Sequence, residues 1–135
     1  MANAIYDLGR ESFLKGEISW SGDNIKVVLV DTADYAVNLA THQFLSSVPV
    51  AARVATSASL TSKTTANGVA DSADVTFTGV TGDISEALVV YQDTANAATS
   101  RLIAYIDTAT GLAVTPNGGD IQVTWDSSVD RIFKL

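Results

Sequence analysis

The sequence predicts an all-β fold, mainly an antiparallel sandwich or a small barrel, that opens with one short helix. Short apolar runs rich in β-branched residues recur at 25–30, 88–92 and 102–106, which is typical of buried strands. Frequent turn signals separate the short strands, and Pro-Asn-Gly-Gly-Asp at 116–120 is the strongest of them. Strands and long helices do not alternate along the chain, which argues against a doubly wound nucleotide-binding sheet.

The run at 25–30 is the stretch around which the other strands are expected to assemble. Only Lys26 interrupts its apolar character, so both faces of this strand are expected to be covered by other structure. Each of the three runs leads into the same tripeptide, Asp-Thr-Ala, which begins at Asp31, Asp93 and Asp107. A short acidic side chain accepts hydrogen bonds from the backbone amides just beyond it. The tripeptide therefore predicts a turn that takes the chain out of the sheet.

Two helices are predicted. The first covers residues 3–16 and ends at Gly16, a natural helix stop. Its apolar stripe comprises Ile5, Leu8, Phe13 and Leu14. The second is a brief helix at 42–47, with Thr41 as its N-cap and Pro49 beyond its end. Shorter extended segments are predicted at 34–38, 52–55, 75–78, 121–125 and 131–135.

The segment 57–74 differs in composition from its surroundings, because Ser, Thr, Ala, Gly and Asn dominate it. Thr and Val favour extended structure, so an edge hairpin or a long arm is predicted. The turn is placed at Asn67-Gly68, between strands at 60–65 and 69–70. Edge strands with small polar side chains pair readily with another chain, which makes this segment the expected subunit contact.

Length and charge limit the classes of function. The chain has 135 residues, which predicts a single domain over 1–135, and it contains no cysteine. The formal net charge is −7, from 15 acidic and 8 basic residues, and the basic residues are scattered singly. Binding to nucleic acid is therefore not expected. No apolar run approaches the length of a membrane span and no secretory signal opens the chain, so a soluble protein made in the cytoplasm is expected.

Candidate catalytic residues all have a simpler structural explanation. His42 is the single histidine, so a Ser-His-Asp triad would have to use it, with Ser46 or Ser47 as the nucleophile. No Gly-x-Ser-x-Gly elbow is present, and a lone histidine is more often structural. A glycosidase would need a pair of catalytic carboxylates, and the candidate glutamates show no recognisable pattern. They are Glu11, Glu17 and Glu86.

Candidate ligand-binding residues are explained equally well by turns and packing. Asp31, Asp93 and Asp107 would form a calcium site if one end of the sheet brought them together, but the chain has no Asp-x-Asp-x-Asp-Gly loop. Turn capping is the preferred role for these residues and for the acidic residues at 23–24 and 71–74. Gly118-Gly119 matches no phosphate-binding spacing.

The aromatic residues are candidates for lining a carbohydrate surface, but they are expected instead to anchor the core or a subunit interface. They are Trp20, Trp125, Tyr6, Tyr35, Tyr91 and Tyr105. The sequence therefore predicts no catalytic, cofactor-binding or metal-binding residue, and the protein is not expected to be an enzyme.

Three parts of the chain carry a resemblance to a known class of proteins. They are the opening, Met-Ala-Asn-Ala-Ile-Tyr-Asp-Leu-Gly-Arg-Glu-Ser-Phe-Leu-Lys-Gly, the stretch 26–35, and the tail at 115–125 with 132–135. Together they resemble a group of small virion proteins of tailed bacteriophages. Within that class the chain is most similar, in size and β-rich character, to the capsid decoration or cement proteins on the outside of the head.

This resemblance implies a structural protein of the virion, located on the outer surface of the head. Such a protein binds the major capsid protein and further copies of itself, and it bridges neighbouring capsomers to stabilise the shell. The resemblance favours a homotrimer and leaves a dimer possible. In either state, many weak contacts with the shell become strong through multivalency. No cofactor, nucleic acid or membrane is an expected partner. The segment 57–74 and the two termini are the expected bridging elements.

Two other functions remain open at this point. One is a tail, neck or fibre-associated virion module that recognises a host glycan, which predicts a sugar-sized pocket near Trp20 or Trp125. The other is a small virion hydrolase built on His42. It would require a half-exposed His42 in a cleft, with an acid and a hydroxyl within hydrogen-bond reach.

Overall fold

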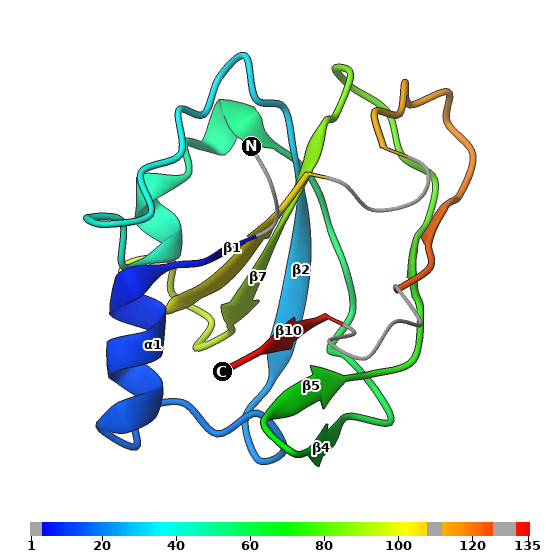
Figure 1. Ribbon diagram of the computed structural model, residues 1–135. Coiled ribbons are helices and arrows are strands. Elements are labelled where there is room, and N and C mark those ends of the chain that lie inside the picture. Colours follow the sequence, from blue (N-terminus) through cyan, green and yellow to red (C-terminus); the bar gives the residue numbers. More distant parts are fainter. Residues whose placement is uncertain (1–3, 108–111, 126–131) are drawn as a thin grey trace.

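A five-stranded antiparallel sheet forms the centre of the molecule, with the strand order β1-β8-β7-β2-β3 (Figure 1). The computed structural model describes residues 4–107, 112–125 and 132–135. The strands of this sheet are β1 Ala4–Ile5, β2 Ile25–Val30, β3 Arg53–Thr56, β7 Ala87–Gln92 and β8 Leu102–Ile106. The three apolar runs are therefore the central strands, and the prediction of a mainly antiparallel β fold with one short N-terminal helix is confirmed.

Two smaller sheets lie beside the central one. A three-stranded sheet has the order β10-β5-β4, and β6 pairs with β9 in a two-stranded sheet. Their strands are β4 Thr64–Ala66, β5 Val69–Asp71, β6 Val75–Phe77, β9 Ile121–Val123 and β10 Phe133–Lys134. The alternating pattern of β6 is confirmed, because Val75 and Phe77 are buried while Thr76 is exposed.

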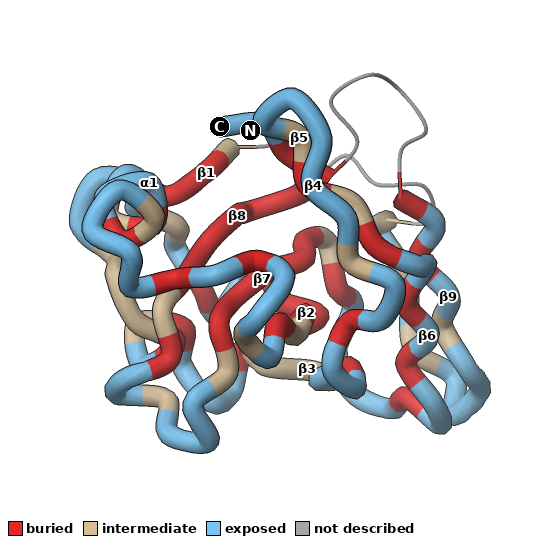
Figure 2. Tube along the Cα trace, turned by 90° about the horizontal axis from the view of Figure 1, so that it is seen from below, coloured by how far each residue is buried: buried red, intermediate tan, exposed pale blue. Residues whose placement is uncertain are grey.

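Both faces of the central sheet are buried, as the composition of 25–30 predicts. Figure 2 shows the buried strands β8, β7 and β2 in the middle of the molecule, with exposed coils around them. One face, with Leu29 and Ile103, packs against the side chains of the two small sheets. The other face, with Val28 and Leu102, is covered by Tyr6, Tyr35 and Val48. The β-branched run thus forms a strand because both of its sides are removed from water.

The N-terminal helix is shorter than predicted and buries a different side. Helix α1 covers Asp7–Leu14, while residues 4 and 5 form β1 and pair with β8. The predicted apolar stripe is wrong for Leu14, which is 88% exposed, whereas Gly9 and Ser12 are buried. A Cβ atom on Gly9 would stand 2.6 Å from the backbone oxygen of Leu102. The helix therefore presents its smallest residues to β8, because only these allow so close an approach.

The segment between β2 and β3 contains less regular structure than predicted. The helix expected at 42–47 is a single 3₁₀ turn, Leu45–Ser47, and a second turn covers Val50–Ala52. Thr41 is not an N-cap; instead the Oδ1 of Asn38 accepts hydrogen bonds from the amides of Ala40 and Thr41. Residues 34–38 form no strand. Among the described residues, no helix is long and apolar enough to cross a bilayer.

The hairpin predicted within 57–74 is present. β4 and β5 pair in register, with Ala66 opposite Val69, and the turn is Asn67-Gly68. Both turn residues have positive φ, +53° and +79°, as a two-residue hairpin turn requires. Of the predicted C-terminal strand, β10 is formed by Phe133–Lys134, and Arg131 lies outside the described residues.

Candidate functional site

The Asp-Thr-Ala tripeptides form the turns that the sequence predicts, where the structure describes them. The Oδ1 of Asp31 accepts a hydrogen bond from the amide of Ala33 at 2.9 Å. The Oδ1 of Asp93 accepts one from the amide of Ala95 at 3.0 Å. The third tripeptide begins at Asp107, and its Thr and Ala lie outside the described residues. The first two aspartates are therefore turn residues whose carboxylates already have backbone partners.

The three aspartates do not meet at one end of the sheet, so the calcium site considered from the sequence is not formed. In the antiparallel order, Ile25 lies opposite Gln92 and Val30 opposite Ala87. Asp93 therefore leaves the sheet at the end where β2 begins, far from Asp31. There its Oδ2 forms an ion pair with the Nζ of Lys26, at a distance of 3.0 Å. Of the acidic residues at 23–24 and 71–74, Asp23 accepts from the amide of Ser19, and Asp74 from the amide of Trp125.

A different group of carboxylates comes together where β2 ends. Asp31, Asp34 and Asp83 offer oxygen atoms that all lie within 4.8 Å of one another. Asp31 is buried, whereas Asp34 and Asp83 are exposed. Three carboxylates supply fewer oxygens than the six to eight that calcium takes. No sequence pattern indicates this group, because Asp83 follows a turn about 50 residues away from Asp31.

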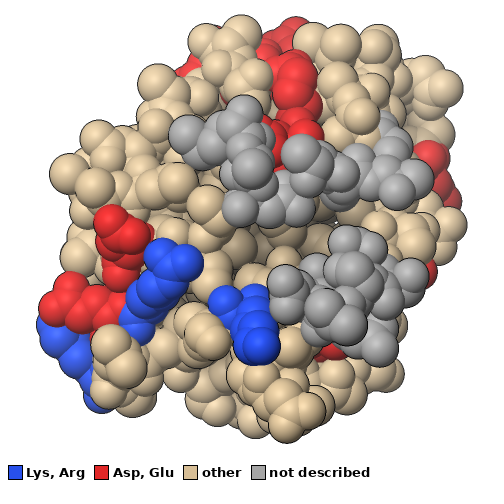
Figure 3. Space-filling model, in the orientation of Figure 1, with Lys and Arg blue, Asp and Glu red and all other residues tan. Residues whose placement is uncertain are grey.

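The two ends of the central sheet differ in charge. Where β2 begins, carboxylates face cations, in the pairs Lys26–Asp93 and Arg101–Glu17. Where β2 ends, Arg53 lies opposite Val30, but its guanidinium donates to the backbone oxygens of Val48 and Leu45. Figure 3 shows acidic side chains at the top of the view, the end at which β2 finishes in Figure 1, and basic side chains beside acidic ones in its lower left part. On this face, the acidic side chains at the end of β2 are therefore not accompanied by basic ones among the described residues.

His42 belongs to a chain of hydrogen bonds between side chains. Its Nδ1 lies 2.9 Å from the Oη of Tyr35, which in turn lies 2.8 Å from the Oη of Tyr6. The rings of Tyr35 and His42 are stacked, with centroids 5.4 Å apart. Tyr6 is fully buried and Tyr35 nearly so. Among the described residues, neither a serine hydroxyl nor a carboxylate bonds to His42, so the triad considered from the sequence is not assembled.

The direction of these hydrogen bonds follows from a backbone amide. The N–H of Asn38 donates to Nδ1 of His42 at 3.3 Å, so this nitrogen is an acceptor and the ring proton is on Nε2. Tyr35 then donates to His42, and Tyr6 donates to Tyr35. Burial raises the pKa of Tyr6 far above its ordinary value, and its charge interaction and hydrogen bond with Tyr35 raise it further. Burial also raises the pKa of Tyr35, while the hydrogen bond from Tyr6 lowers it.

We expect Tyr35→Phe to destabilise the protein more than Tyr6→Phe. Loss of the Tyr35 hydroxyl leaves the buried hydroxyl of Tyr6 without its acceptor, which costs about 1–3 kcal/mol. Loss of the Tyr6 hydroxyl leaves Tyr35 bonded to His42 and costs about 0.5–1.5 kcal/mol. Urea unfolding of both variants and of the double variant measures the difference. An equal or larger loss of unfolding free energy in Tyr6→Phe would contradict the direction assigned to these hydrogen bonds.

The structure gives Glu11 and Glu86 other partners and holds Glu17 and Glu86 at opposite ends of β7. Glu11 pairs with Lys15 on the exposed face of α1, and Glu86 accepts hydrogen bonds from the amide and hydroxyl of Thr32. The backbone oxygen of Glu17 accepts from the side chain of Gln92, the last residue of β7, while Glu86 directly precedes β7. Six residues of strand span about 20 Å, which exceeds the separation of either type of catalytic carboxylate pair.

Both tryptophans are buried anchors. The Nε1 of Trp20 donates to the backbone oxygen of Asp71, and that of Trp125 donates to the backbone oxygen of Ala73. The ring of Trp20 meets Phe133 edge to face, with centroids 5.2 Å apart. A hollow of about 170 Å³ lies beside Trp20 and is lined mostly by apolar side chains. This volume is below the roughly 300 Å³ at which ligand pockets begin.

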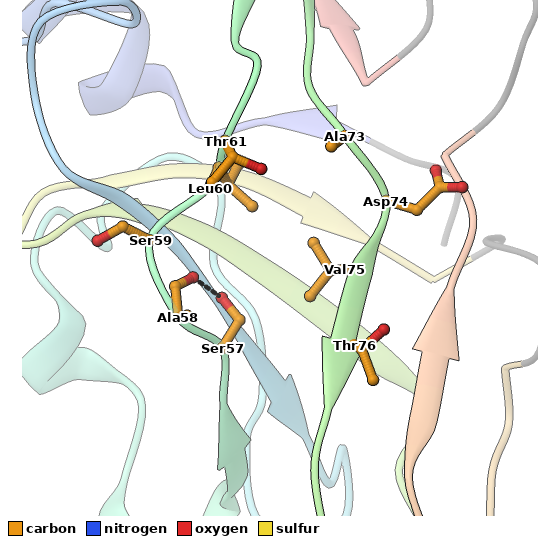
Figure 4. Close-up of a pocket in the computed structure, with 9 residues that line it drawn as sticks. All are labelled: Ser57, Ala58, Ser59, Leu60, Thr61, Ala73, Asp74, Val75 and Thr76. Carbon is orange, nitrogen blue, oxygen red and sulfur yellow. Dashed lines mark hydrogen bonds between the residues drawn. The ribbon is translucent and has the colours of Figure 1, made fainter.

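A second hollow lies between the segment 57–61 and the segment 73–76 (Figure 4). Its volume is about 230 Å³, and small polar side chains such as Ser59 and Thr76 line it. The two segments are joined at one end by the amide of Ala73, which donates to the backbone oxygen of Thr61 at 2.9 Å. On one side the hollow is bounded by Ser57, whose hydroxyl donates to the backbone oxygen of Ala58.

The stretch 54–70, which we call the neutral segment, has an unusual surface for an acidic protein. It contains one charged residue, Lys63, whose Nζ donates to the backbone oxygen of Asp23. Most of its other residues between Thr56 and Gly68 are exposed. Depletion of charge is a feature of protein interfaces, so this surface is the best candidate for a functional one in the described structure.

A scan against protein-family models and a search of curated proteins match nothing to this chain.

Proposed function

We propose that the protein is a decoration protein of a bacteriophage head, which binds the major capsid protein from outside and bridges neighbouring capsomers as a homo-oligomer. The observation that supports this role best is the neutral segment: an exposed, extended and almost uncharged surface on a chain of net charge −7. A protein bound to a repeating shell needs surfaces of this kind, because each bound copy approaches others of equal charge.

The resemblance of the termini and of 26–35 to small virion proteins supports the same proposal. The side chains considered for catalysis or metal binding have structural partners. His42 forms a hydrogen bond with Tyr35, and Asp31 and Asp93 accept hydrogen bonds from turn amides. Residues of the same chain cover both faces of the central sheet. The hydrophobic core is therefore complete before the protein contacts the shell.

Addition of the purified protein to phage heads that lack it tests this proposal. Cryo-electron microscopy of the washed particles is expected to show regular extra density over the capsomer junctions. The decorated heads are expected to withstand heat or osmotic shock better than bare heads. Density confined to the tail, or no binding to heads, would overturn the proposal, and host-surface glycans would then be the ligands to examine.

A matched pair of variants locates the contact. Ser59→Asp adds a negative charge to the exposed surface of the neutral segment, whereas Gln122→Glu adds one to the exposed side of β9. If the neutral segment meets the shell, we expect Ser59→Asp to lower the occupancy on heads and Gln122→Glu to leave it unchanged. Equal occupancy of the two variants would exclude the neutral segment as the contact surface.

A further inference from the structure

Strand β4 is an open edge of the three-stranded sheet, whose order is β10-β5-β4. In Figure 1 it lies at the bottom of the molecule, next to β5. All three of its residues, Thr64–Ala66, are exposed. Natural edge strands are usually protected by being very short, or by Lys, Pro, a bulge or an inward-pointing charge. β4 is short, but it contains none of the other four protections. The flanking Lys63 is held by the backbone oxygen of Asp23.

The register of the hairpin shows which backbone groups of β4 face outwards. Ala66 and Val69 flank a two-residue turn and therefore form a hydrogen-bonded pair. Because the pairs of an antiparallel ladder alternate, Thr65 and Ala70 are a non-hydrogen-bonded pair. The backbone oxygen of Ala70 accepts instead from the amide of Ile132, on the β10 side. The N–H and C=O of Thr65 accordingly point away from β5, into the open edge.

The charges around this edge favour another copy of the same chain as its occupant. Two copies of net charge −7 repel each other, so they meet most easily through a surface without carboxylates. The neutral segment, which contains β4, has none. In an antiparallel pairing centred on Thr65, Lys63 faces Asn67 of the second copy and Thr64 faces Ala66 of the second copy. No like charges are therefore placed opposite each other.

We infer that two copies of this protein associate through their β4 strands, antiparallel and about a two-fold axis that passes beside Thr65. The N–H of each Thr65 donates to the C=O of the other, and the two three-stranded sheets become one continuous sheet. Such a contact is isologous and closes as a dimer. This dimer forms in solution without any phage head, so its test is independent of whether the protein binds phage heads.

A matched pair of variants at one position tests the inference. Thr65→Pro removes the outward N–H and leaves the bonds between β4 and β5 in place, while Thr65→Ala keeps that N–H. In sedimentation velocity over a range of concentrations, we expect the unmodified protein and Thr65→Ala to dimerise alike. We expect Thr65→Pro to dimerise at least about tenfold more weakly. A monomer at all concentrations, a trimer, or equal dimerisation of Thr65→Pro would overturn the inference.

Cross-linking decides the question if Thr65→Pro does not fold. The chain has no cysteine, so Thr65→Cys introduces a single thiol. Across the proposed axis the two Cα atoms would lie about 5.5 Å apart, so a short bis-maleimide reagent reaches both thiols. We expect this reagent to give cross-linked dimers of Thr65→Cys at low protein concentration, and Thr76→Cys, exposed on β6, to remain largely monomeric with the same reagent. Equal rates for the two variants would overturn the inference.

Discussion

Above pH 10 the protein is expected to lose stability steeply as the pH rises. Four tyrosines are almost completely buried and have a raised pKa, chiefly through burial: Tyr6, Tyr35, Tyr91 and Tyr105. In the unfolded chain they release their protons near pH 10, whereas in the folded protein they retain them. The unfolded state therefore binds fewer protons, and the free energy of unfolding falls with pH. Between pH 10 and its pKa in the folded protein, each of these tyrosines contributes about 1.4 kcal/mol per pH unit. Tyr6 and Tyr91 have the most strongly raised pKa values and therefore contribute over the widest pH range.

Urea unfolding at pH 8, 10, 10.5 and 11 measures this slope. For Tyr91, burial and the charge of Asp93 raise the pKa to about 12, so its contribution extends over pH 10 to 12. Tyr91→Phe is the matched control and is expected to reduce the slope by about 1.4 kcal/mol per pH unit. Phenolate absorbance near pH 10 in the still-folded protein, or a slope unchanged by Tyr91→Phe, would contradict the expectation.

Truncation of a leucine on either face of the central sheet is expected to be strongly destabilising. Leu29 is fully buried on the face covered by the two small sheets, and Leu102 is fully buried on the opposite face. Replacement of a buried leucine by alanine costs about 2–5 kcal/mol, through lost transfer energy and the cavity that is left. A total stability of about 5–15 kcal/mol is usual for a domain, so each loss is a large fraction of it.

Chemical denaturation of Leu29→Ala and Leu102→Ala, with Thr76→Ala as an exposed control, tests the burial of both faces. An ordinary sandwich has solvent on the outer face of each sheet, where a truncation changes stability by no more than about 0.5 kcal/mol. A loss confined to one of the two leucine variants would show that only one face of the sheet forms a core. Thr76→Ala is expected to change stability little, because this side chain is exposed.

The features that could be predicted from the sequence are those decided by neighbouring residues. A β-branched run forms a buried strand, Asp-Thr-Ala forms a turn, and Asn-Gly forms a hairpin turn, because each depends on local conformational preference. The face of α1 was predicted wrongly for the opposite reason. Leu14 is apolar and exposed whereas Gly9 is buried, since the close approach of β8, about 90 residues further along the chain, decides which side chains fit.

The hydrogen bonds between side chains also depend on residues that are far apart in the sequence. Tyr6, Tyr35 and His42 form one chain of hydrogen bonds, although Tyr6 is separated from Tyr35 by 29 residues. No spacing rule connects these residues, because their proximity is created by the strand order. The sequence did favour structural roles for His42 and for Asp31, and their hydrogen bonds to Tyr35 and to the amide of Ala33 agree with those roles.

The strand order has a consequence for synthesis on the ribosome. β2, the most apolar strand, pairs with β7, and about 60 residues separate Ile25 from Ala87. At 5–20 residues per second, roughly 3–12 s pass between the emergence of these two strands. Its other neighbour, β3, follows sooner but covers one edge only. During translation, the apolar strand β2 is therefore exposed without its main partner β7, a state that favours aggregation. We expect the yield of folded protein to depend on how quickly the second half of the chain is synthesised.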